Sequence, residues 1–100
     1  MSNQYADFLR EDQRLVMLRI LSELPQYSSN SSVMANLLGR YGHHPSRDQV
    51  KGDLTWLGEQ GLLTIDDIGS VLVVTLTERG GEVAEGRASV PGVSKPKPGR

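Results

Sequence analysis

Apolar residues follow a helical period in one stretch of the chain and a strand-like pattern directly after it. Over residues 46–60 the apolar side chains Val50, Leu54 and Leu57 recur at i, i+4 and i+7, which places them on one face of an α-helix. The short apolar runs that follow this stretch have no such period. The pattern therefore predicts a helix followed by strands.

Both ends of this helix carry recognisable signals. Ser46 and Gln49 have the spacing of a capping box, in which each side chain satisfies a backbone amide at the helix start. Gly61 predicts the end, because a left-handed residue closes a helix at little cost when it is glycine. Beyond it, Leu62–Ile65 and the β-branched run Val71–Leu76 predict two strands. They are joined by the turn residues Asp66-Asp67-Ile68-Gly69-Ser70.

A longer helix is predicted over residues 7–24, with Asp7 as its cap and Pro25 just beyond its end. Its apolar stripe is broad, and Val16 and Leu21 at its margin are candidates for contact with a second subunit. The stripe consists of Phe8, Leu15, Val16, Leu18, Ile20, Leu21 and Leu24. The outward-facing set is Arg10, Glu11, Asp12, Arg14 and Arg19.

Between these helices, residues 27–32 are polar and rich in serine, which favours a loop over a helix. A second helix is expected to begin at Asn30 or Ser31 and to run to Tyr41, with Val33, Met34, Leu37, Leu38 and Tyr41 on its buried face. The serines are interpreted as helix-capping residues, and the alternatives are phosphorylation or contact with phosphate. Gly42-His43-His44-Pro45 is an expected exposed turn.

The C-terminal part divides into a short helix and a tail. Thr77 is the expected cap of a fourth helix, in which Val83 and Ala84 form an apolar seam and the glycines limit the length. Residues 87–100 are rich in proline, glycine and basic side chains, and predict a flexible tail that either aids solubility or acts as an electrostatic arm. The expected organisation is a frayed N-terminus over 1–6, one domain over 7–86 and this tail.

The predicted fold is α+β and mainly helical, with three helices, a two-stranded hairpin and a short terminal helix. Its core should include Leu18, Leu37, Leu54, Leu57 and Leu63. The stretch Leu54-Thr55-Trp56-Leu57-Gly58-Glu59-Gln60-Gly61-Leu62-Leu63 resembles the end of a recognition helix in the winged helix-turn-helix superfamily. Leu76-Thr77-Glu78-Arg79-Gly80 resembles the strand-to-helix junction after the wing. In size and order the chain is similar to ArsR- and MarR-like bacterial regulators and to small winged-helix proteins of Mu-like prophages.

This resemblance implies a small DNA-binding protein, a transcription regulator acting as a homodimer through its terminal helices. The residues of the third helix nearest its start would then face double-stranded DNA. Arg47 has the geometry to read guanine, and Gln49 to read adenine. The expected DNA-binding set is Arg40, Ser46, Arg47, Gln49, Lys51, Gly52 and Thr55.

The distribution of charge along the chain argues against DNA binding. The chain carries −1 overall, but four of its eleven basic residues and none of its twelve acids follow Gly86, so residues 1–86 carry seven bases against twelve acids, or −5. Asp48 and Asp53 stand where the family has neutral polar or basic residues, and Asp66-Asp67 would repel phosphate from the wing. The alternative is a protein–protein interaction module of a phage or prophage system, with Trp56 as an exposed anchor.

Other functions lack their residues. The chain contains no cysteine, no glycine-rich phosphate loop and no metal-ligand set, so neither enzymatic activity nor a cofactor is expected. The adjacent pair His43-His44 does not supply the three or four ligands of a zinc site. No run approaches the ~18 apolar residues of a membrane span, and the expected location is the cytoplasm.

Overall fold

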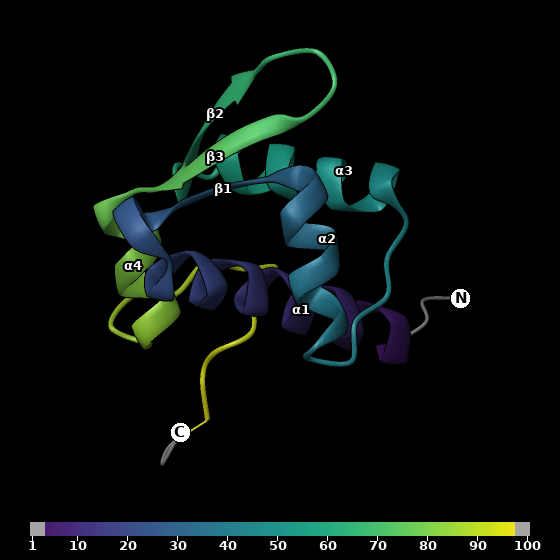
Figure 1. The fold of residues 1–100 in the computed structure, drawn as a ribbon. Helices are drawn as coiled ribbons and strands as arrows, with labels where there is room; N and C mark the ends of the chain where they lie inside the picture. The colour runs from purple at the N-terminus through teal and green to yellow at the C-terminus, as the bar shows by residue number, and fades with distance from the viewer. Residues whose placement is uncertain (1–3, 98–100) are drawn as a thin grey trace.

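A computed structural model describes residues 4–97 of the chain (Figure 1). Over these residues the protein is α+β and mainly helical, with four α-helices and a three-stranded antiparallel sheet. The elements are α1 (Gln4–Glu23), a 3-10 turn (Pro25–Tyr27), β1 (Ser28–Asn30), α2 (Ser31–Gly39), α3 (Arg47–Glu59), β2 (Leu63–Asp67), β3 (Leu72–Leu76) and α4 (Glu78–Glu85). No helix in this part of the chain has the length and apolarity that crossing a bilayer requires.

One hydrophobic core holds these elements together, and every helix contributes to it. Burial of apolar surface is the main favourable term in folding, so this core fixes where each helix presents its other face. Of the five leucines predicted in the core, Leu18, Leu54, Leu57 and Leu63 are buried, and Leu37 is half-buried against the cluster. The core residues are Leu15, Met17, Leu18, Ile20, Leu21, Met34, Leu38, Val50, Leu54, Leu57, Leu62, Leu63, Leu72, Val74, Val83, Ala84, Val90 and Val93.

Helix α1 differs from its prediction at its start. It begins at Gln4, so residues 4–6 are helical rather than frayed, and residues 1–3 lie outside the described part. Asp7 consequently lies in the first turn and is not the cap. Phe8, placed in the core stripe from sequence, is 55% exposed because this end of the helix extends beyond the core. Leu21 is fully buried within the same chain, which removes it as a contact for a second subunit.

Helix α2 is capped as predicted, since the Asn30 side chain accepts a hydrogen bond from the Val33 amide at 2.9 Å. Met34 and Leu38 are buried. Val33 and Tyr41 are exposed, contrary to the prediction. Tyr41 leaves the helical line because the helix ends at Gly39, and Val33 lies one residue, about 100°, away from the buried Met34.

Strand β1 is absent from the predicted elements. It lies in the serine-rich segment expected to be a loop and pairs with β3, with Ser29 opposite Val74. A side chain of β1 also bonds to β3, since Ser28 Oγ donates to the Val74 carbonyl at 3.0 Å. Such a strand carries no apolar pattern, because its stability comes from a partner that lies over forty residues later.

Strand β3 is the central strand, with β1 on one side and β2 on the other. The predicted hairpin is confirmed, although β2 runs to Asp67, so that Asp66 and Asp67 lie in the strand rather than in the turn. Only Leu63 of β2 is buried. The hairpin therefore projects beyond the core, as its place at the top of Figure 1 shows.

The predicted cap of α4 is confirmed, since Thr77 Oγ1 accepts from the Gly80 amide at 3.0 Å. The Thr77 hydroxyl also donates to the Gly61 carbonyl at 2.7 Å, and the Thr77 amide donates to the Leu62 carbonyl at 3.1 Å. These bonds bring α4 against the start of β2. A Cβ on Gly80 would overlap the backbone oxygen of Leu62 at 1.9 Å.

The described part of the C-terminal tail, residues 87–97, is packed rather than flexible. Val90 and Val93 are buried in the core, and the Ser94 amide donates to the Glu11 carbonyl of α1 at 3.2 Å. Burial of two valines outweighs what the proline- and glycine-rich composition suggested. Residues 98–100 lie outside the described part.

We expect Gly80→Ala to lower the free energy of unfolding by more than ~2 kcal/mol, because backbone rather than a flexible side chain blocks the new methyl. Gly81→Ala is the matched control, since its Cβ would meet only Leu76 at 3.8 Å and alanine favours the helix by roughly 0.5–1 kcal/mol. Urea unfolding measures both. Equal effects of the two variants would contradict the close approach.

Gly92→Ala should detach the tail from α3. A Cβ there would lie 2.7 Å from the Trp56 ring, and the residue has φ +98°, which alanine rarely adopts. Trp56 is the only tryptophan, so its fluorescence reports the change directly. We expect a red-shifted emission relative to the wild type and to Gly52→Ala, a variant of α3 with open space at its Cβ. An unchanged emission maximum in Gly92→Ala would rule out this contact.

Candidate nucleic-acid interface

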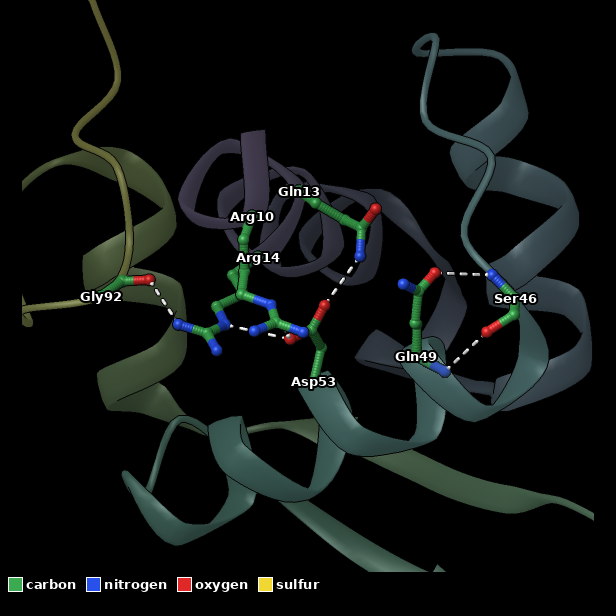
Figure 2. Close-up of polar contacts among 7 residues, drawn as sticks. All are labelled: Arg10, Gln13, Arg14, Ser46, Gln49, Asp53 and Gly92. Carbon is green, nitrogen blue, oxygen red and sulfur yellow. Dashed lines mark hydrogen bonds and ion pairs between the residues drawn. The ribbon is translucent and has the colours of Figure 1, made fainter. Parts of the chain in front are cut away.

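Helix α3 has one buried face and one exposed face. The predicted capping box is present, with the Gln49 amide 3.1 Å from Ser46 Oγ and the Ser46 amide 2.9 Å from Gln49 Oε1 (Figure 2). Val50, Leu54 and Leu57 are fully buried, as predicted. The opposite line, consisting of Asp48, Gly52, Thr55 and Glu59, is exposed throughout.

The DNA-binding residues predicted on α3 differ in whether their side-chain polar groups already take part in hydrogen bonds. Arg47, Gly52 and Thr55 are exposed, and none takes part in a described side-chain hydrogen bond. In Ser46 and Gln49, by contrast, the side-chain oxygens already cap the helix. The Gln49 amide nitrogen is the group of that side chain left for a ligand.

Arg47 and Lys51 meet two other elements in one small hollow of about 40 Å³. Its remaining lining residues are Ser31 and Ser32 at the start of α2 and Ser70 and Val71 after the hairpin turn. Lys51 is half-buried, and its Nζ lies 3.5 Å from the Ser70 carbonyl oxygen. Two cations, the start of a helix and the hairpin turn therefore come together here, an arrangement suited to an anion.

Arg40, predicted as part of the same set, is placed apart. It is exposed and follows the last residue of α2, and it does not line the hollow of Arg47 and Lys51.

Asp53 of α3 has a structural role that was not predicted from the sequence. It is 3% exposed and faces α1 rather than solvent. Its carboxylate accepts from Gln13 Nε2 at 2.7 Å and from Arg14 Nε at 3.1 Å, and Arg10 Nε lies 3.8 Å away (Figure 2). A buried carboxylate requires such partners because its desolvation is costly. Asp53 is thus a link between α3 and α1 and not a charge presented to DNA.

Arg14, the partner of Asp53, also contacts the tail, and its contacts contradict two predictions. It was expected to face outward, yet its guanidinium lies 4.0 Å from the centroid of the Trp56 ring and also donates to the Gly92 carbonyl at 3.1 Å. Trp56 is half-buried between Arg14 and Gly92. It is therefore not the exposed anchor that the interaction hypothesis assumed, and Trp56→Ala would disturb packing before it tested any partner.

The sequence did contain a signal for this cluster. Asp53 is three residues after Val50 and one before Leu54, so it falls within the apolar stripe of α3. Arg14 likewise stands four residues before Leu18 and seven before Leu21, on the buried side of α1. A charged residue within an apolar stripe indicates a buried pair. Which two stripes face each other is not encoded locally.

The hairpin acids have separate roles. Asp67 Oδ1 accepts from the Gly69 amide at 2.8 Å, which stabilises the turn as an Asx motif. Asp66 is exposed, as are Ile65 and Ile68 on either side of the pair. The acidic character expected for this hairpin is thus present at its surface, together with two exposed isoleucines that the sequence analysis did not single out.

His43 was expected to be an exposed turn residue, but its side chain is 11% exposed and its Nε2 lies 2.8 Å from Asp12 Oδ2. The pair fastens the turn between α2 and α3 to α1. Among residues 4–97, no group of three or more histidine, cysteine or acidic side chains is placed to hold a metal ion.

Two known proteins are similar to this chain. Uncharacterized protein gp26 of Escherichia phage Mu is 49% identical over 92 residues, which cover 92% of this chain and 95% of the phage protein. An uncharacterized protein of Haemophilus influenzae is 45% identical over 76 residues, covering 75% of this chain and 74% of the other. No protein family model and no solved structure match. The chain belongs to the family of phage Mu protein gp26.

Proposed function

We propose that the protein is a small winged-helix DNA-binding protein, a transcription regulator acting as a homodimer without enzymatic activity. The element order helix, strand, helix, helix and two-stranded hairpin is that of a winged helix-turn-helix. In this interpretation α3 is the recognition helix and β2–β3 is the wing. The relationship to a phage Mu protein is compatible with a regulator of a phage or prophage system.

The observation that carries the proposal is the hollow shared by Arg47 and Lys51. It brings together the start of α2, the first two turns of α3 and the hairpin turn, where a phosphate between two grooves would contact all three. Next to it, the exposed face of α3 offers Arg47, Gly52 and Thr55 to base edges. Arg47 is the residue that would read guanine, and Gly52 permits close approach of the backbone.

The acidic body limits this activity without excluding it. Asp53 is one of its twelve acids, and its charge is paired internally with Arg14. Asp48 lies in the first turn of α3, where it favours the helix dipole. The exposed acids near the interface that remain opposed to phosphate are Glu59, Asp66 and Asp67. Binding should therefore be weak for one copy and strongly salt-dependent, and two copies on symmetric half-sites would raise specificity.

The tail is not part of the proposed DNA surface. Lys95 and Lys97 line a hollow with residues of α1, namely Phe8, Asp12, Leu15 and Arg19, and no residue of α3 borders it. Removing residues 87–100 would also remove Val90 and Val93 from the core. Point substitutions are therefore the appropriate test of the electrostatic arm.

We expect Arg47→Ala to weaken binding to a duplex selected from a random pool by ~1–3 kcal/mol, or about 5- to 150-fold, and to relax preference at one base pair. Fluorescence anisotropy at ~50 mM salt, where electrostatic affinity is high, measures this. Arg79→Ala, which removes an exposed arginine from α4, is the control and should leave affinity unchanged. Failure of the wild type to bind any duplex at this salt concentration would refute the proposal.

The double variant Lys95→Ala and Lys97→Ala should leave both DNA affinity and its salt dependence unchanged, because these side chains lie along α1. The same anisotropy titration, repeated over several salt concentrations, gives the slope. A slope reduced by one to two would instead mean that the tail reaches phosphates.

A second function is favoured by the hairpin itself. Asp66, Ile65 and Ile68 form an exposed acidic and apolar edge, which suits a basic protein partner better than DNA. Under this alternative the protein is an interaction module of a phage or prophage system. Asp66→Asn, which leaves the Asp67 turn intact, should then release a co-purifying partner, while Arg47→Ala should have no effect on it.

A further inference from the structure

Basic side chains border the exposed line of α3 on both sides. Successive residues of a helix are turned by about 100°, which places Lys51 and Arg47 about 100° and 140° from Gly52 in one direction. Asp53 lies about 100° from Gly52 in the other direction and faces the arginines of α1 (Figure 2). The hollow of Arg47 and Lys51 therefore lies on one flank of the exposed line, and α1 lies on the other.

On the α1 side, a depression of about 410 Å³ reaches the exposed line of α3. It is lined by Arg10 and Arg14 of α1 and by Asp48, Gln49, Gly52, Asp53 and Trp56 of α3. Because Asp48 and Gly52 belong to the exposed line, helix α1 brings arginine side chains directly beside the surface that would face DNA.

Arg10 is the cation of this depression that the fold leaves available. The Arg14 guanidinium is occupied, since it donates to Asp53 and to the Gly92 carbonyl. Arg10 Nε, by contrast, is 3.8 Å from Asp53 Oδ1, which is beyond hydrogen-bonding distance, and the Arg10 side chain is 58% exposed. The Asp53 carboxylate already accepts hydrogen bonds from two other side chains. Its burial is therefore satisfied without Arg10, whose guanidinium is free to bind another anion.

The position of Arg10 fits a phosphate of the DNA backbone. The major groove of B-DNA is about 12 Å wide, and a helix with its side chains has nearly the same diameter, about 10–12 Å. A helix in the groove thus has one phosphate backbone along each flank. We propose that Arg10 binds a phosphate of the strand opposite to the one that meets the hollow of Arg47 and Lys51. This inference rests on the proposed function and adds to it a contact from α1 that fixes the register of α3 in the groove.

The acids around Arg10 are compatible with this contact. Asp53 is paired with Arg14, so its charge does not oppose a phosphate in the depression. Asp48 lies in the first turn of α3, where the positive end of the helix dipole offsets part of its charge. Asp7 borders the recess on the other side of Arg10 and does not line this depression. A phosphate here meets one free cation and one partly offset acid, so we expect the strength of a single phosphate contact.

The test is Arg10→Gln, which removes the charge while Asp53 keeps its two hydrogen bonds. We expect affinity for duplex DNA to fall roughly tenfold at ~50 mM salt, and the slope of log affinity against log salt to decrease by about one, because one counterion fewer is released. The loss should be equal for a selected and an unrelated duplex, since phosphates carry no base information. Arg10→Lys should keep the slope. Fluorescence anisotropy over several salt concentrations measures these quantities.

Arg19→Gln is the matched control. It removes the same charge from the same helix, but about 180° around α1 from Arg10, where Arg19 borders the hollow of Lys95 and Lys97. DNA affinity and its salt dependence should be unchanged in this variant. Urea unfolding should show nearly the same midpoint for all three variants and the wild type, because an exposed ion pair contributes little to stability.

Several results would overturn this inference while leaving the proposed function standing. They are an Arg10→Gln variant that binds as the wild type does, a control that loses as much as Arg10→Gln, and a loss confined to the selected duplex. An Arg10→Lys variant whose slope falls as far, or an Arg10→Gln variant that unfolds at much lower urea, would show that Arg10 acts only in the structure and would overturn it too. A wild type that binds no duplex would refute the proposed function and this inference together.

Discussion

The buried carboxylate of Asp53 is the constraint on which the arrangement of α3 depends. An ionised group inside a protein must be paired and hydrogen-bonded, because its desolvation otherwise costs several kcal/mol. Gln13 and Arg14 meet this requirement, and Arg14 at the same time contacts Trp56 and the Gly92 carbonyl. One side chain thereby joins α1, α3 and the C-terminal segment. The apolar stripe allows α3 some freedom to rotate, whereas a directed ion pair on one flank does not, so the line from Asp48 to Glu59 is held toward solvent.

Much of the local structure could be predicted from sequence because its causes are local. The capping box of Ser46 and Gln49, the caps at Asn30 and Thr77, and the left-handed Gly61 all depend on residues within a few positions. The β-branched run of β3 and the apolar line of α3 likewise follow from short-range periodicity. Caps and contacts confined to one or two turns can be predicted without knowledge of the rest of the chain.

What could not be predicted arises between segments distant in sequence. Strand β1 is polar and exists because β3 pairs with it, and Val90 and Val93 are buried because the C-terminal segment folds back onto the core. From sequence, Trp56 and His43 are expected to be exposed. The fold instead brings Arg14 against Trp56 and Asp12 against His43. The winged-helix assignment, the DNA-binding residues and the homodimer remain predictions, since the related proteins carry no described function.

The turn between α2 and α3 connects α1 to the start of the exposed face of α3. On one side Gly42 and Pro45 line a recess beside α1, and on the other the turn ends at Ser46, the cap of α3. Both the backbone and a side chain hold the turn in place. The His43 amide donates to the Leu38 carbonyl at 3.1 Å, and the His43 ring contacts the Asp12 carboxylate. A turn held in this way transmits the position of α1 to the first residue of α3. Arg47 is that residue, so the pair of His43 with Asp12 and the pair of Asp53 with Arg14 fix α3 against α1 at two separate points, one just before its start and one on its buried side.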